Sequence, residues 1–173
     1  MNIAYTMAPG RGDTNLLLFN LARSLAGAGV RPCGTVQIDN ERDRDGPCDM
    51  DIKVLPDGPV IRISQNLGRG SHGCRLDTNA LETAVGLVEA DLATGADCLI
   101  VNKFGKHEAQ GHGFRAVIAE ALSGGIPVLV GTNKLNQDAF EVFAGGLARN
   151  LPPDAKSLED WVRAHAPRRA NAG

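Results

Sequence analysis

The chain has 173 residues, a length that predicts one domain with a substantial core. Its formal net charge is −2 and 43% of its residues are hydrophobic, which excludes wholesale disorder and argues against nucleic acid as a partner. No stretch reaches the about 18 apolar residues of a membrane span, and residues 1–7 lack the pattern of a signal peptide. We therefore expect a soluble, cytoplasmic protein with no membrane partner.

In chain order, short apolar runs alternate with amphipathic stretches. The apolar runs predict strands, and apolar residues spaced three and four apart predict helices. The expected strands are 3–7, 35–38, 52–55, 60–63, 97–101 and 126–130, and the expected helices are 16–25, 79–92, 114–122, 136–147 and 157–162. Asn79, with Glu82 three residues on, and Ser157 are the predicted N-caps of the second and the last helix.

The order of these elements predicts the fold class. Apolar strands alternating with helices favour a mostly parallel sheet covered on both faces, and Asp57-Gly58 between two β-prone runs adds a hairpin. The acid-rich stretch 39–51 is expected to be a solvated loop. The result is one three-layer α/β domain over residues 1–166 and a flexible tail at 167–173.

Ligands of such folds bind beyond the carboxyl ends of the strands, where glycine-rich loops are expected here. The loop 8–14 has the layout of a P-loop, whose backbone N–H groups and helix N-terminus surround a phosphate. A working P-loop ends in Gly-Lys-Thr, whereas this one ends in Gly12-Asp13-Thr14. Asp13 suits the N-cap of the next helix, and Arg11 is a substitute cation. The candidate anion ligands are Gly10, Arg11, Gly12 and Thr14; a plain strand-to-helix turn is the alternative.

The loop 65–77 concentrates hydrogen-bond donors on a glycine-rich backbone, an arrangement that binds anions. The helix that follows would direct its positive end at the same space. Its candidate ligands are Arg69, Ser71, His72 and Arg75. The alternative is a surface loop whose arginines face water.

The loop 102–113 follows a buried strand, where a P-loop enzyme places the carboxylate that holds Mg²⁺. Asn102 stands at that place, so a metal would be held weakly or not at all. Lys103 and Lys106 are candidate anion ligands, and Glu108 is either a catalytic base or the acid of a helix start. The two histidines of this loop are five residues apart, which does not match the four-residue spacing of a zinc-binding helix, and no metal site is expected.

The four cysteines form no C-x-x-C pair, so neither a zinc site nor a redox motif is expected. Cys33 and Cys98 fall in predicted strands and are expected in the core. Cys74 lies between two arginines of the glycine-rich loop, a setting that stabilises a thiolate.

Three runs of sequence carry a resemblance to a known family: Val101–Gly111, Leu67–Gly68 and Cys74–Asp77. They resemble an uncharacterised bacterial family, described as hypothetical or NTP-binding, whose genes often lie beside those for molybdate uptake or molybdenum enzymes. The resemblance covers residues 1–150. The layout is also distantly similar to the small nucleoside-triphosphatases first described from thermophiles, which have an intact P-loop and an Asp-Glu-x-Gly-like segment in place of residues 102–105. The resemblance implies a P-loop-type α/β fold with degenerate Walker motifs and does not transfer hydrolysis.

The residues and the resemblance together favour binding of a tetrahedral oxyanion. The first hypothesis is a protein that binds molybdate, tungstate or nucleotide phosphate and acts in molybdenum supply or its regulation, without catalysis. The second is a slow Mg²⁺-dependent nucleoside-triphosphatase in which Glu108 orients water. The third is a non-catalytic interaction module whose partner is a molybdenum-enzyme or transporter component. A homo-oligomer remains open.

Overall fold

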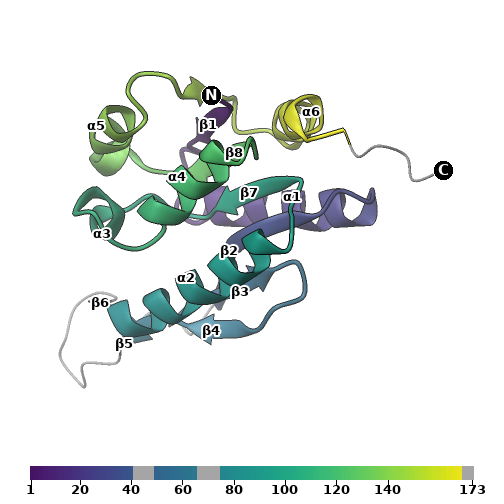
Figure 1. Cartoon of the computed structure of the whole chain (residues 1–173). Helices are drawn as coiled ribbons and strands as arrows, with labels where there is room; N and C mark the ends of the chain where they lie inside the picture. The colour runs from purple at the N-terminus through teal and green to yellow at the C-terminus, as the bar shows by residue number, and fades with distance from the viewer. Residues whose placement is uncertain (41–48, 66–74, 169–173) are drawn as a thin grey trace.

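The computed structural model describes residues 1–40, 49–65 and 75–168. Within these ranges a seven-stranded sheet has the order β4-β3-β2-β7-β8-β1-β9, and β5 pairs with β6 in a second sheet. The strands are β1 (Ile3–Thr6), β2 (Pro32–Asn40), β3 (Asp49–Leu55), β4 (Val60–Arg62), β5 (Ser64–Gln65), β6 (Arg75–Leu76), β7 (Cys98–Val101), β8 (Val128–Gly131) and β9 (Arg149–Asn150). The helices are α1 (Asp13–Gly27), α2 (Thr78–Ala93), α3 (Lys106–Ala109), α4 (Arg115–Ser123), α5 (Lys134–Phe143) and α6 (Ala155–His165) (Figure 1).

The sheet is parallel from β2 to β9, and the hairpin strands β3 and β4 are antiparallel to their neighbours. Thr35 is in register with Val101, Val101 with Val130, and Thr6 with Gly131. The ends of β1, β7 and β8 therefore lie at one edge of the sheet, and the loops after them leave from that edge. The predicted hairpin and the mostly parallel sheet are both confirmed.

Helices cover both faces of the sheet (Figure 1). On one face α1 and α6 bury Leu18 and Leu158. On the other face α2, α4 and α5 bury Val88, Ile118 and Phe140. The strands β1, β7 and β8 are buried along their whole length because both of their faces are covered. Among the helices of the described ranges, none has both the length and the apolar composition that crossing a membrane requires.

The contact between β2 and β7 depends on small residues. Gly34 has a φ of 113°, and a Cβ at that position would overlap the carbonyl oxygen of Ile100. On the same two strands the thiols of Cys33 and Cys98 are buried, as the sequence predicts for both. Burial raises the pKa of the Cys33 thiol to about 11 and that of the Cys98 thiol to about 12.

The predicted acidic loop 39–51 is wrong at both of its ends, because β2 continues to Asn40 and residues 49–51 belong to β3. β3 begins at Asp49, and Asp51 is 8% exposed inside this strand. The pattern of acids predicted solvation, but Arg62 on β4 donates to the Asp51 carboxylate, with Nε and Oδ1 3.0 Å apart. A cross-strand partner in the same hairpin thus allows an acid to lie in a strand.

Two predicted N-caps are also wrong, and both are replaced by an upstream aspartate. The Asp77 carboxylate accepts from the N–H of Ala80 at 3.1 Å, so Asn79 lies inside α2. The Asp154 carboxylate accepts from the N–H of Ser157 at 2.8 Å, and Ser157 lies inside α6. In both helices the carboxylate satisfies a donor of the first turn, and the N-cap lies two residues (α2) or three residues (α6) earlier than predicted.

Candidate functional site

A cavity of about 530 Å³ lies at the edge of the sheet where the loops after β1 and β7 begin. Seven of the predicted anion-binding and catalytic residues line it: Gly10, Arg11, Gly12, Thr14, Lys103, Lys106 and Glu108. Arg69, Ser71 and His72 lie outside the described residues, and so does the side chain of Arg75. The fold thus brings the first and third predicted loops to one cavity, and the contribution of the central loop stays a prediction.

The loop after β1 enters α1 through a glycine in the left-handed conformation. Gly12 is the N-cap of α1, with a φ of 79°, so Asp13 is the first helical residue and not the predicted cap. The Asp13 N–H donates to the Gly10 carbonyl at 3.3 Å, and the Ala8 N–H donates to the Thr14 hydroxyl at 2.9 Å. A glycine cap supplies no side-chain oxygen to the first turn. Gly10, Gly12 and Thr14 line the cavity, so the N-terminal, positive end of α1 lies beside it.

Asn102 occupies the place of the metal-binding carboxylate of a P-loop enzyme and lines the cavity from the end of β7. Its Oδ1 accepts from the Gln37 backbone N–H at 2.8 Å, and its Nδ2 donates to Asn15 Oδ1 at 2.8 Å. A neutral amide with both polar atoms engaged does not fit a Mg²⁺ position, which calls for carboxylate oxygens. In the described parts of the chain, no group of three or more His, Cys, Asp or Glu side chains could hold a metal ion.

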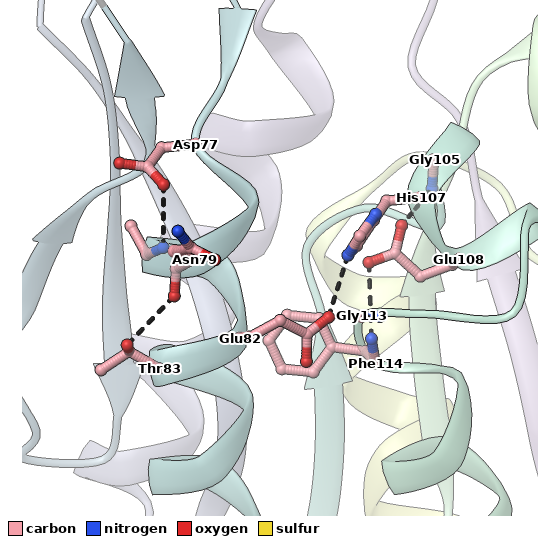
Figure 2. A network of polar contacts seen from close by, with 10 residues as sticks. Asp77, Asn79, Glu82, Thr83, Gly105, His107, Glu108, Gly113 and Phe114 are labelled. Carbon is pink, nitrogen blue, oxygen red and sulfur yellow. Dashed lines mark hydrogen bonds and ion pairs between the residues drawn. The ribbon is translucent and has the colours of Figure 1, made fainter.

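Both carboxylate oxygens of Glu108 are engaged by backbone N–H groups (Figure 2). Oε2 accepts from Gly105 at 3.0 Å, and Oε1 accepts from Phe114 at 3.4 Å. The residue is 3% exposed, and burial raises the pKa of its carboxyl against the opposing effect of these N–H groups. Glu108 therefore closes the turn around α3, which is the helix-start role that the sequence left open beside a catalytic one.

A second polar cluster connects α2 to the same turn (Figure 2). Glu82 Oε1 accepts from the Gly113 N–H at 2.9 Å and lies 2.9 Å from Nε2 of His107. The rings of His107 and His112 have centroids 5.1 Å apart. Partial burial raises the pKa of Glu82, but its hydrogen bonds to His107 and Gly113 outweigh burial and hold that pKa below its ordinary value. The sequence assigned Glu82 to a capping box, and only the tertiary contact shows that it holds the turn.

Part of the cavity lining is apolar, and sequence reasoning did not identify it. Met50 and Ile52 come from β3, Ile63 follows β4, Leu76 belongs to β6, and Leu81 lies on α2. The predicted hairpin and helix account for Ile52, Ile63 and Leu81 as core residues. Periodicity separates buried from exposed positions but does not distinguish a packed core from a cavity wall.

Comparison of the sequence with known proteins identifies its family. The sequence matches the family described as "protein of unknown function (DUF2478)" over residues 3–161. A relative from Bradyrhizobium diazoefficiens, named molybdenum import ATP-binding protein ModC 2, is 36% identical over 153 residues. That alignment covers 87% of this chain and 17% of the relative, so the chain corresponds to a small part of that protein's length.

The fold also resembles a solved structure, described as the solution structure of a human cancer-related nucleoside triphosphatase. The TM-score is 0.60, and the match covers 98% of this chain and 100% of the other. The two chains are 18% identical, so the likeness concerns the fold alone. The fold predicted from the sequence, a P-loop NTPase-like α/β domain, is thereby confirmed.

Proposed function

We propose that this chain, which belongs to the DUF2478 family of proteins of unknown function, binds a tetrahedral oxyanion in the cavity and does not hydrolyse it. The anion is the phosphate of a nucleotide or an inorganic relative such as molybdate or tungstate. One observation carries the proposal: the glycine loop at the start of α1 and two lysines of the β7–α3 loop line the same cavity. Backbone N–H groups, a helix N-terminus and ammonium groups are the donors that such an anion requires.

The lysines supply the charge that the loop after β1 lacks. Lys103 and Lys106 are both exposed and both line the cavity, so their ammonium groups can reach an anion there without a large desolvation cost. Arg11 lines the cavity beside them. Asp13 opposes binding, but its side chain is exposed, and water and salt screen its charge. The balance of charges at the cavity therefore favours an anion.

Two substitutions and one engaged carboxylate argue for binding without turnover. Asp13 stands where a P-loop enzyme has its lysine, and Asn102 stands where it has the metal-holding acid. Glu108 lines the cavity, but its carboxylate already accepts two backbone hydrogen bonds, so it is poorly placed to orient a water molecule as well. Binding of an anion survives these changes, because backbone donors and lysines do not depend on Mg²⁺.

The name of the Bradyrhizobium relative supports a cellular setting for this proposal. That protein is named for molybdenum import and for ATP binding. We place the present chain in molybdenum supply or its regulation, with a transporter component or a molybdenum enzyme as the protein partner. A nucleotide and molybdate are both consistent with this setting, and the experiment below includes both.

Isothermal titration calorimetry with ATP, GTP, molybdate and tungstate, each with and without Mg²⁺, tests the proposal. We expect heat of binding from at least one ligand, little effect of Mg²⁺, and no phosphate release above the buffer rate. Lys103→Ala and Lys106→Ala should each weaken binding by about tenfold or more, since a hydrogen bond to a charged group contributes about 1.5–3 kcal/mol. Lys156→Ala, an exposed lysine of α6 outside the cavity, is the matched control. Absence of binding by all four ligands would overturn the proposal, as would equal affinity in all three variants.

A further inference from the structure

The cavity is larger and more apolar than a bare oxyanion requires. Its volume of about 530 Å³ lies within the ~300–1,000 Å³ range of pockets that hold organic ligands. A molybdate or phosphate ion consists of one central atom and four oxygens, and it would leave most of this space to water. Water against an apolar wall carries a free-energy cost that an organic group on the ligand removes.

The apolar wall is formed by five side chains from four parts of the chain: Met50 and Ile52 of β3, Ile63 after β4, Leu76 of β6 and Leu81 of α2. Phe114, just before α4, adds an aromatic ring to it. The wall thus belongs to the added hairpin, the small β5–β6 sheet and α2, whereas the donors belong to the loops after β1 and β7. Anion donors and apolar wall come from different parts of the chain and meet in one cavity.

Thr35 adds a polar group to this wall. It lines the cavity from β2, although the residue is only 2% exposed. Within the described part of the chain, the Thr35 hydroxyl makes no side-chain hydrogen bond. Every fully buried side-chain nitrogen or oxygen atom in that part has a hydrogen-bond partner, so the Thr35 hydroxyl is not fully buried. The hydroxyl therefore opens on the cavity, where it can donate to or accept from one polar group of a ligand.

We propose that the natural ligand is an organic phosphate or equivalent oxyanion ester whose compact apolar or aromatic body lies against the wall of Met50, Ile52, Ile63, Leu76 and Leu81. This inference rests on the proposed function, because the charged end of the ligand binds the donors of the loops after β1 and β7. It adds the class of ligand and the residues that select it. The wall discriminates between ligands by their bodies, and Thr35 recognises one polar atom on the body.

The test is a series of phosphates that share the charged end and differ in the body: orthophosphate, methyl phosphate, phenyl phosphate and naphthyl phosphate. Burial of one aromatic ring should make phenyl phosphate bind about tenfold more tightly than methyl phosphate, or better. The wall variants are Met50→Gln and Leu76→Asn, at positions that are only partly buried and therefore tolerate a polar atom. The control is Val60→Asn, an exposed apolar residue of β4 outside the cavity.

We expect both wall variants to weaken phenyl phosphate binding by about fivefold or more and to leave orthophosphate binding unchanged, whereas Val60→Asn should change neither affinity. Met50 also provides a direct readout by NMR spectroscopy. The chain has three methionines, and the Met50 methyl signal can be assigned because it is lost in Met50→Gln. That signal should shift with phenyl phosphate and not with orthophosphate.

The possible results separate the two proposals. Equal affinity for all four phosphates would overturn the inference about the body and leave oxyanion binding intact. Tighter binding of phenyl phosphate that neither wall variant weakens would place the body elsewhere and would overturn it too. If none of these phosphates binds and ATP, GTP, molybdate and tungstate also fail to bind, the proposed function itself fails.

Discussion

Replacement of Glu108 by alanine tests whether this carboxylate holds the cavity wall together. The carboxylate accepts from two backbone N–H groups, Gly105 at 3.0 Å and Phe114 at 3.4 Å. In Glu108→Ala these donors lose their partner in a region where Glu108 itself is 3% exposed. The loops that carry Lys106 and the start of α4 would then lose the group that connects them.

The magnitude follows from the two hydrogen bonds. A buried donor left without a partner costs about 1–3 kcal/mol, and the longer bond at 3.4 Å contributes less than the shorter one. Burial raises the pKa of this carboxyl, so its charge carries a cost that the alanine variant removes. We therefore expect a net loss of about 1–3 kcal/mol in the free energy of unfolding at pH 7. For a chain of this size that loss lowers the Tm by about 2–12 °C.

The pH dependence has a definite sign. Because the folded-state pKa of Glu108 is raised, the folded protein binds more protons than the unfolded chain between the unfolded and folded pKa values. The contribution of Glu108 to stability is greatest below the unfolded pKa, falls as pH rises through the folded pKa, and is smallest above it. The wild type should therefore exceed Glu108→Ala in stability by more near pH 4 than near pH 7. The first pH is close to the ordinary pKa of a glutamate, and the second is well above it.

The assay is urea unfolding followed by far-UV circular dichroism, performed at both pH values. Glu120→Ala, which removes an exposed acid of α4, is the control and should change stability by less than about 0.5 kcal/mol. If Glu108→Ala is as stable as the control at both pH values, the carboxylate does not hold the turn and the reasoning fails. A variant whose deficit grows with rising pH would refute the sign of the pKa shift.

Three other predictions concern separate parts of the molecule. Asp13→Asn should raise the affinity for orthophosphate or molybdate up to about fivefold in calorimetry at low salt, because it removes an exposed like charge; unchanged affinity would place the anion away from α1. Gly34→Ala should cost about 2–5 kcal/mol in urea unfolding, since φ is 113° and a Cβ meets the β7 backbone, whereas Gly86→Ala in open space on α2 should be neutral or stabilising. In a variant whose other two cysteines are serine, Cys33 and Cys98 should resist a thiol reagent at pH 8 until denaturant is added, because burial raises the pKa of both thiols; rapid labelling of the native protein would contradict this.

The sequence determines the main elements and their order, because these follow from local patterns; it does not reveal the short elements β5, β6, α3 and β9. Apolar runs separated by amphipathic helices predict a parallel sheet, and Asp57-Gly58 predicts the hairpin. The same reading places the loops 8–14 and 102–113 at strand ends, and both line the cavity. Parallel strands in register put such loops at one edge of the sheet, so sequence alone brings Gly12 and Lys106 toward a common site.

The tertiary structure decides which chemical groups are engaged and which face the cavity. Asn102 and Glu108 are polar residues in a candidate site by sequence, yet their hydrogen bonds to Gln37, Asn15, Gly105 and Phe114 give them structural roles. The apolar wall likewise needs β3, β6 and α2 to meet. These contacts join segments far apart in the chain, and a periodic pattern records only that a side chain is covered, not what covers it.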